Sequence, residues 1–308
     1  MRSTAEAPAK VILSGEHFVV HGAWALAAAI PRMVRVEVQQ AEGFSVDSDR
    51  YPKGSRSLAP VSRLVEEMAR EYSFSPSLRV TVRSEVPEGA GLGSSAATMV
   101  ALVAALSRLH ALGLGWDEVA ARAMSGERLV HGRPSGVDPA VCAMGGVILF
   151  RTGSKPRRVH LNRGRSLVVS FSGQRRSTRG QIAKVTSVGK GFPSLFSRLA
   201  EAVGESSLAA SEALASGDME ELGGLMTLGH AVLSSLGVSN RTLDRQVDHL
   251  ISEGCYGAKL TGAGGGGSVV GVAPEGKEKR IASSLGARGY ETFVAEIPVG
   301  GVRSWLGR

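Results

Sequence analysis

The sequence predicts an α+β fold, in which strands and helices come in blocks and do not alternate strictly. The chain has 308 residues, of which 43% are hydrophobic and 21% are charged, enough for a packed core in one or two domains. Segments with the period-two pattern of half-buried strands are followed by long segments with helical spacing. The 40 glycines gather in clusters, which mark tight turns and close approaches of the backbone.

The first half of the chain contains three strand candidates and three helix candidates. Residues Met33–Val38 alternate apolar and polar side chains, as a half-buried strand does. Residues Pro60–Tyr72 carry apolar side chains at helical spacing, and Trp116–Val130 has Asp117 and Glu118 in its first turn, where the helix dipole favours carboxylates. The expected elements are strand Val11–Leu13, strand Met33–Val38, helix Pro60–Tyr72, strand Leu78–Val82, helix Ser94–Leu112 and helix Trp116–Val130.

The second half begins with strands, continues with a long helical region and ends with strands. The helical region runs from Ser194 to Glu253 and is interrupted near Ser216–Asp218 and Leu236–Gly237. Residues Arg151–Gly164 are basic, contain glycine and lack a clear period, so we place a domain boundary there, which gives units 1–155 and 156–308. The expected elements are strands Gly145–Phe150, Ser166–Phe171, Ala258–Thr261, Ser268–Val272 and Thr292–Ile297, and a helix near Lys277–Leu285.

The composition limits the partners and the compartment. The net charge of +8 fits either a generally basic surface or an anionic ligand such as a nucleoside triphosphate. The densest basic stretches, Lys155–Arg158 and Arg175–Arg179, are too short to indicate RNA or DNA. The two cysteines, Cys142 and Cys255, lie far apart in the sequence and form no zinc motif. A chain with so few cysteines is typical of a reducing compartment. With no signal-peptide layout and no apolar run as long as a membrane span, we expect a soluble cytoplasmic protein without nucleic-acid or membrane partners.

A glycine-rich segment, Pro87–Ala97 (PEGAGLGSSAA), stands between a predicted strand and a predicted helix. Its glycines let backbone N–H groups approach an anion, and a helix start adds free N–H groups and the positive end of a dipole. Ser94 and Ser95 are suitable N-cap residues, and either hydroxyl could bind Mg²⁺ or a phosphate oxygen. The segment has neither the GxxxxGK[ST] nor the GxGxxG pattern, so it predicts a phosphate site of another type; the alternative is a turn that only caps a core helix. The residues expected to bind ATP are Pro87, Gly89, Ala90, Gly91, Leu92, Gly93, Ser94, Ser95, Ala96 and Ala97.

Three segments, in order along the chain, resemble the kinase family named for galactokinase, homoserine kinase, mevalonate kinase and phosphomevalonate kinase. They are Ala7–His17 (APAKVILSGEH), Pro87–Ala97 and Lys259–Gly267 (KLTGAGGGG). The resemblance extends from about Glu6 to about Ile297. It implies a two-lobed small-molecule kinase, with an N-terminal lobe of the ribosomal protein S5 type and a C-terminal ferredoxin-like lobe. It also implies ATP bound between the lobes, and family members are often homodimers.

Two segments are most similar to the mevalonate kinase branch of that family. One is Lys10–Gly22 (KVILSGEHFVVHG), where galactokinases instead resemble GEHxDY. The other is Glu127–Asp138 (ERLVHGRPSGVD), which is similar to E-x3-HG-x-PSG-x-D. The resemblance therefore implies phosphorylation of (R)-mevalonate at its 5-hydroxyl by ATP, a step of isoprenoid precursor biosynthesis. The alternatives are another alcohol kinase of the same fold, acting on a different mevalonate hydroxyl, homoserine or a sugar, and a non-catalytic member that acts as a sensor.

The resemblance also implies roles for single residues. Phosphoryl transfer needs a proton acceptor, a cation near the phosphate and a magnesium site. Asp138, interpreted as part of a tight turn after a helix, is implied as the catalytic base, with Lys10 as the cation beside it. Ser95 and Glu127 are the implied ligands of Mg²⁺, which prefers oxygen. A non-catalytic member would be expected to have lost at least one of these four residues.

The substrate pocket is implied at five further positions. They are Glu16, His17, Thr178, Arg179 and Thr261. Of these, Arg179 could clamp the substrate carboxylate with two parallel hydrogen bonds. The other histidines, His21 among them, match no pattern and are interpreted as structural.

Overall fold

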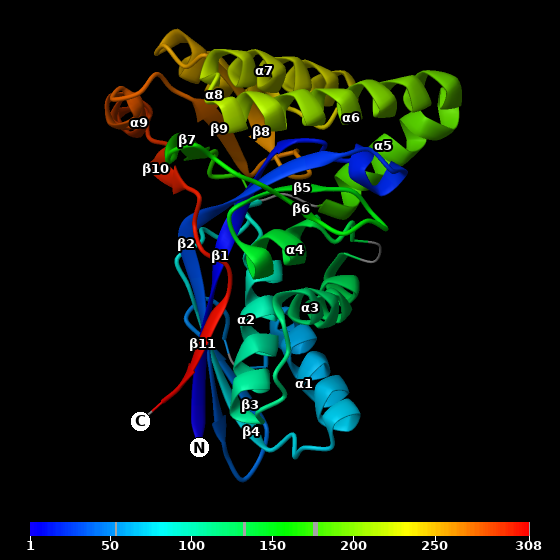
Figure 1. Ribbon diagram of the computed structural model, residues 1–308, viewed down its shortest axis with the longest axis vertical. Coiled ribbons are helices and arrows are strands. Elements are labelled where there is room, and N and C mark those ends of the chain that lie inside the picture. The colour runs from blue at the N-terminus through cyan, green and yellow to red at the C-terminus, as the bar shows by residue number, and fades with distance from the viewer. Residues whose placement is uncertain (53, 132–133, 175–177, 308) are drawn as a thin grey trace.

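The computed structural model describes residues 1–52, 54–131, 134–174 and 178–307. They form two lobes stacked along the long axis of the molecule, each built on one sheet (Figure 1). The predicted mixture of helices and strands is therefore confirmed. Within the described residues, none of the helices combines the length and the apolar character that crossing a membrane requires.

The sheet of the first lobe is built around two long antiparallel strands, β1 (Arg2–Ser14) and β2 (Ala25–Gln40). Every residue of β1 from Ser3 to Ser14 is buried, and Ala5, Ala7 and Ala9 lie on one face of the strand, so helices can approach the sheet closely there. The sheet order is β11-β1-β2-β4-β3, with β5 on β2 and β6 on β5. The remaining strands are β3 (Ser45–Ser48), β4 (Leu78–Ser84), β5 (Val147–Phe150), β6 (Arg157–Val159) and β11 (Arg303–Leu306).

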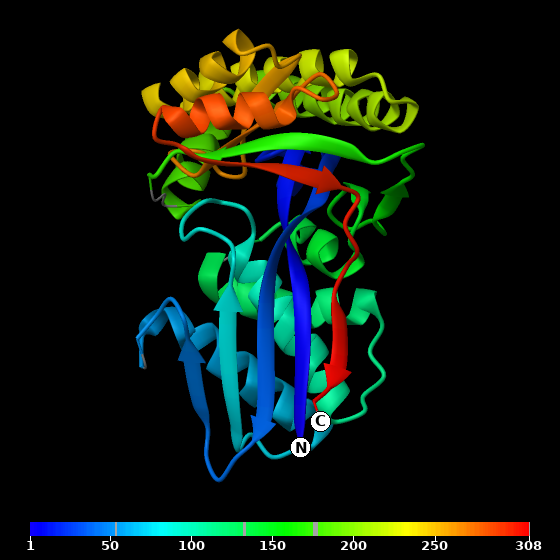
Figure 2. The same ribbon diagram turned by 90° about the vertical axis from the view of Figure 1, so that its left-hand side faces the viewer.

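Helices cover one face of this sheet and leave the other face open (Figure 2). The central helix is α2 (Ser94–Leu109), which contacts β1, β2 and α3 and buries most of its residues. Short 3-10 helices, η1 (Phe18–His21) and η2 (Arg56–Leu58), interrupt the loops. The other helices of this lobe are α1 (Ala59–Tyr72), α3 (Trp116–His131) and α4 (Val137–Met144).

The second lobe has a four-stranded antiparallel sheet in the order β10-β7-β9-β8. Helices α6, α7 and α8 pack on the side of this sheet that faces away from the first lobe, and α5 lies at the junction of the lobes (Figure 1). The strands are β7 (Arg165–Phe171), β8 (Gly257–Thr261), β9 (Ser268–Val272) and β10 (Glu291–Ile297). The helices are α5 (Thr178–Gly191), α6 (Pro193–Ser216), α7 (Met219–Ser235), α8 (Arg241–Ser252) and α9 (Glu278–Ala287).

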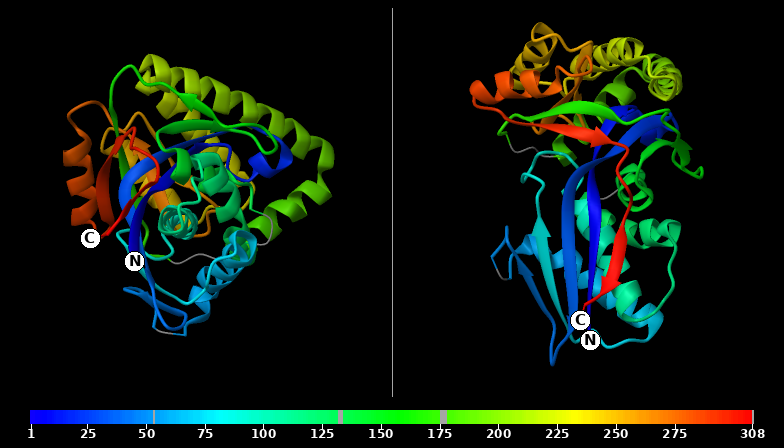
Figure 3. Two further views of the ribbon diagram at one scale, coloured as in Figure 1. Left: turned by 60° about the horizontal axis from the view of Figure 1, so that its bottom comes forward. Right: turned by 60° about the vertical axis from the view of Figure 1, so that its left-hand side comes forward.

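Two strands of the expected second unit belong to the first sheet. β6 pairs with β5, and β11 pairs antiparallel with β1, so that the two chain termini lie side by side (Figure 2 and Figure 3). A boundary between residues 155 and 156 stays a prediction, and the chain crosses back over it at its end.

Several expected boundaries need correction. Gly145 and Gly146 have positive φ angles of 69° and 73°, so the strand expected from Gly145 starts at Val147. The helices α4 and α5 were not expected. α4 has only eight residues, too few to show a helical period, and α5 contains three glycines, which lower its helix propensity. The breaks predicted in the long helical region are confirmed, because α6 ends at Ser216 and α7 ends at Ser235.

Candidate active site

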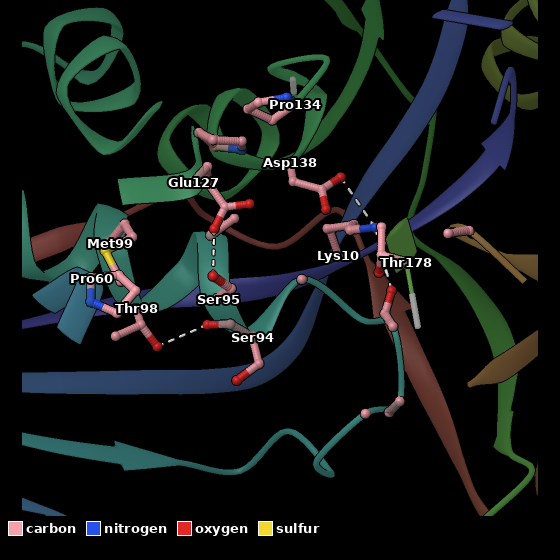
Figure 4. Close-up of a pocket in the computed structure, with 18 of the residues that line it drawn as sticks. Lys10, Pro60, Ser94, Ser95, Thr98, Met99, Glu127, Pro134, Asp138 and Thr178 are labelled. Atoms are coloured by element: carbon pink, nitrogen blue, oxygen red, sulfur yellow. Dashed lines mark hydrogen bonds and ion pairs between the residues drawn. The ribbon is translucent and has the colours of Figure 1, made fainter. Parts of the chain in front are cut away.

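A cavity of about 820 Å³ opens at the junction of the two lobes. Both lobes contribute to its walls: the end of β1, η1, the glycine-rich loop and α4 from the first lobe, and α5 with Gly262 and Ala263 from the second. Figure 4 shows the part of the cavity where charged side chains from three different elements converge, Lys10 of β1, Glu127 of α3 and Asp138 of α4. The volume and the mixture of apolar and charged walls are typical of a site for small molecules.

The glycine-rich loop leads directly into α2. Gly89, Gly91 and Gly93 all have positive φ angles, of 74°, 76° and 80°, which residues with a Cβ rarely adopt. The N-cap of α2 is Gly93 and has no side-chain cap, so the expectation that Ser94 or Ser95 caps the helix is wrong. The first N–H groups of such a helix have no partner within the helix, and they are suited to bind phosphate oxygens.

Most of the residues expected to bind ATP line the cavity. They are Pro87, Gly89, Ala90, Gly91, Gly93, Ser94, Ser95 and Ala96. Leu92 and Ala97 are exceptions, because their side chains are buried in the hydrophobic core and are not part of the cavity wall.

Lys10 and Asp138 form an ion pair in the cavity, with 3.1 Å between Lys10 Nζ and Asp138 Oδ1 (Figure 4). Both residues line the cavity, and the Lys10 side chain is 1% exposed whereas that of Asp138 is 30% exposed, so the carboxylate is the more accessible of the two groups. Lys10 Nζ also donates to the carbonyl of Gly91 at 3.4 Å. Asp138 lies in the first turn of α4, after the left-handed Gly136, and not in a separate turn as expected.

Ser95 and Glu127 form the second polar pair of the cavity. Ser95 Oγ donates to Glu127 Oε1 at 2.5 Å, which joins the start of α2 to α3 (Figure 4). The Glu127 carboxyl is 2% exposed, and burial raises its pKa from 4.5 to about 7. The hydrogen bond from Ser95 and the charge of Lys10 oppose this rise, whereas the charge of Asp138 adds to it. The pair therefore offers oxygen ligands, and a cation bound beside it would stabilise the ionised form of the Glu127 carboxylate.

The expected substrate residues do not all face the cavity with their polar groups. Glu16 is buried and forms an ion pair with Lys259 of β8, which also donates to the carbonyl of Leu260 at 2.8 Å. His17 lines the cavity, and its Nε2 lies 3.0 Å from the carbonyl oxygen of Ala263. Thr178 lines the cavity from the first turn of α5.

Two of the expected substrate residues lie outside the cavity wall. Thr261 is buried and outside the cavity wall; its hydroxyl accepts from the N–H of Ile12 at 2.8 Å and lies 3.2 Å from the Ile12 carbonyl oxygen. It therefore joins the two lobes, and its expected contact with a ligand stays a prediction. Arg179 is exposed and does not line the cavity, because the first turn of α5 turns it toward solvent while Thr178 faces inward.

Some residues that line the cavity were not predicted from the sequence. Thr98 and Met99 follow Ser94 and Ser95 by one helical turn, so their place on the same face of α2 could have been inferred from the spacing. His21 lines the cavity and packs edge-on against Phe196, with 4.9 Å between ring centroids. The loop of residues 48–51 also lines the cavity, and no sequence signal marks it. Two predicted segments, Glu127–Asp138 and Arg175–Arg179, are described only in part. Gly132 and Arg133 of the first and residues 175–177 of the second lie outside the described residues.

Comparisons with known proteins agree with this geometry. The N-terminal domain of GHMP kinases matches residues 59–146, and the C-terminal domain matches residues 210–291. The mevalonate kinase of Aeropyrum pernix is 37% identical, covering 97% of each chain, and that of Methanothermobacter thermautotrophicus is 35% identical, covering 98% of this chain and all of its own. The crystal structure of L. major mevalonate kinase in complex with R-mevalonate superposes with a TM-score of 0.83 at 30% identity, covering 96% of each chain.

Proposed function

The chain belongs to the GHMP kinase family, and we propose that it transfers the γ-phosphoryl group of ATP to the 5-hydroxyl of (R)-mevalonate. The products are 5-phosphomevalonate and ADP. The observation that carries this proposal is the Lys10–Asp138 ion pair beside the glycine-rich loop, which places a proton acceptor and a cation next to a phosphate site. The relatives at 35–37% identity that share nearly the whole chain are mevalonate kinases, which supports the choice of substrate.

In the proposed reaction, Asp138 accepts the proton of the substrate hydroxyl while that oxygen bonds to the γ-phosphorus and the bond to the bridging oxygen of ADP breaks. Phosphoryl transfer depends mainly on positioning and on neutralising charge. Lys10 Nζ lies between Asp138 and the carbonyl of Gly91, so its positive charge faces both the proton acceptor and the phosphate loop. Its near-complete burial strengthens these interactions, because water does not screen them.

The donor set of Ser95 and Glu127 fits Mg²⁺. The described residues contain no cluster of three or more His, Cys, Asp or Glu side chains that could hold a metal. This is consistent with magnesium, which typically takes one or two protein carboxylates and completes its shell with substrate phosphates and water. When bound, the ion would neutralise charge on the β- and γ-phosphates, and it would favour the ionised form of Glu127.

At the substrate end we propose contacts from His17 and Thr178; Glu16 also lines the cavity, but its carboxylate is paired with Lys259, so we propose an indirect role for it. A homodimer and a cytoplasmic location stay predictions.

The test is an ADP-release assay with mevalonate, homoserine, galactose and phosphomevalonate as acceptors. We expect turnover with mevalonate and with none of the other three acceptors. Asp138→Asn, prepared in parallel, should show strongly reduced turnover and so controls for contaminating kinases. Clear activity on another acceptor with none on mevalonate would refute the proposal.

A further inference from the structure

The glycine-rich loop is held from outside at three consecutive carbonyl groups. Ser268 Oγ donates to the carbonyl of Ala90 at 2.9 Å. Lys10 Nζ donates to the next carbonyl, that of Gly91, at 3.4 Å, and the backbone N–H of Lys10 donates to that of Leu92 at 2.9 Å. Two of these contacts come from β1 within the same lobe, whereas Ser268 reaches across from β9 of the second lobe.

Fixing a carbonyl also fixes the N–H of the same peptide unit. In a planar trans peptide the N–H points away from the C=O. The contact from Ser268 therefore sets the direction of the Gly91 N–H, because Ala90 and Gly91 share one peptide unit. Gly91 lines the cavity and has a positive φ of 76°, so its flanking peptides could rotate more easily than those of other residues if nothing held them.

Ser268 is itself held firmly. It is fully buried and pairs with Thr261 across the β8–β9 ladder. The loop before it is tied to its surroundings, since the N–H of Gly265 donates to Val238 at 2.6 Å and that of Gly267 donates to Gln174 at 3.0 Å. The hydroxyl therefore projects from a rigid hairpin toward the loop.

We infer that Ser268 is a positioning residue for the nucleotide: its hydroxyl orients the Ala90–Gly91 peptide so that the loop presents its N–H groups to the phosphates. The inference rests on the proposed use of ATP, and it adds a residue of the second lobe to the phosphate site. A side chain that served only to fill the core would have no effect specific to the nucleotide.

The experiment compares Ser268→Ala with Ser170→Ala. Ser170 is a matched control, because it is a fully buried serine on neighbouring strand β7 whose hydroxyl contacts Thr292 and Gln246, all within the second lobe. Affinity for Mg·ATP is measured by calorimetry without an acceptor, so the result does not depend on the identity of the substrate. We expect Ser268→Ala to weaken ATP binding about fivefold, the effect of losing one neutral hydrogen bond, and Ser170→Ala to leave it unchanged.

Two further measurements separate positioning from general destabilisation. Melting temperatures of both variants show whether they lose comparable stability, and steady-state kinetics should show a higher KM for ATP with an unchanged KM for mevalonate. Ser268→Cys, which keeps the size and a weak donor, should fall between the wild type and Ser268→Ala and serves if the alanine variant does not fold. Unchanged ATP affinity in the Ser268 variants, or an equal loss in Ser170→Ala, would overturn the inference.

Discussion

The buried carboxyl of Glu127 leads to a prediction about the free energy of unfolding, which can be measured without any enzymatic turnover. Its pKa lies at about 7 in the folded protein and at 4.5 ordinarily, so between these values the folded chain retains a proton that the unfolded chain has released. Stability falls with rising pH wherever the folded state holds more protons. The carboxyl therefore lowers the free energy of unfolding as the pH rises through this window, by about 3 kcal/mol in total.

We expect Glu127→Gln to remove this fall. A glutamine keeps an oxygen that can accept the hydrogen bond from Ser95, but it has no charge to desolvate. The difference in unfolding free energy between variant and wild type should therefore grow by about 3 kcal/mol between about pH 4.5 and about pH 8, in favour of the variant. The same variant should need more Mg²⁺ for activity, since it loses the carboxylate proposed to bind the ion.

The assay is urea unfolding of the ligand-free protein across this pH range. Glu66→Gln, an exposed carboxylate on α1, is the control and should follow the wild type. Parallel pH profiles for Glu127→Gln and the wild type would show that the carboxyl titrates normally, and the reasoning from its burial would be wrong. An unchanged Mg²⁺ requirement would separately remove Glu127 as a ligand.

Three other substitutions test the site. Asp138→Asn should lower kcat about 10²- to 10⁴-fold, the usual contribution of a general base, with ATP affinity within about twofold of the wild type; retained turnover would exclude the base role. Gly93→Ala should destabilise the protein and raise the KM for ATP, because Gly93 has a φ of 80° and a Cβ at this position would lie 2.8 Å from Cγ of Lys10. An unchanged melting temperature would contradict this. Arg179→Ala should change the KM for mevalonate by less than about twofold, since the side chain is exposed and outside the cavity wall; a large rise would return Arg179 to the substrate site.

The parts of the fold that depend on local signals could be predicted from the sequence. The break between α6 and α7 is an example, because Gly217 adopts a left-handed φ of 89° and the Asp218 side chain accepts from the N–H of Glu221 at the start of the next helix. Pairings between distant segments could not be predicted this way. β11 has four residues and no strong pattern of its own, and its place is set by the ladder with β1 at the other end of the chain.

In the candidate site, too, local motifs could be predicted and contacts between distant segments could not. Motifs supplied the residue types at Lys10, Ser95, Glu127 and Asp138, and the structure brings these four side chains together. What the sequence could not supply is which neighbour each polar group contacts. Thr261 stands in a glycine-rich motif and was expected at the ligand, yet its hydroxyl is engaged with Ile12 across the lobe junction.

The buried polar side chains of the β8–β9 hairpin raise the question of what they are for. Lys259, Thr261 and Ser268 are all fully buried, and each contacts the first lobe, at Glu16, Ile12 and Ala90 respectively. Burying an ion pair or a hydroxyl adds little stability compared with an apolar group of similar size, because desolvation offsets most of the interaction. A hairpin that only held the lobes together would be at least as stable with apolar side chains. Directional contacts to the end of β1 and to the phosphate loop instead fix the orientation of the elements that carry Lys10 and the N–H groups for ATP, so we infer that orientation is their main contribution.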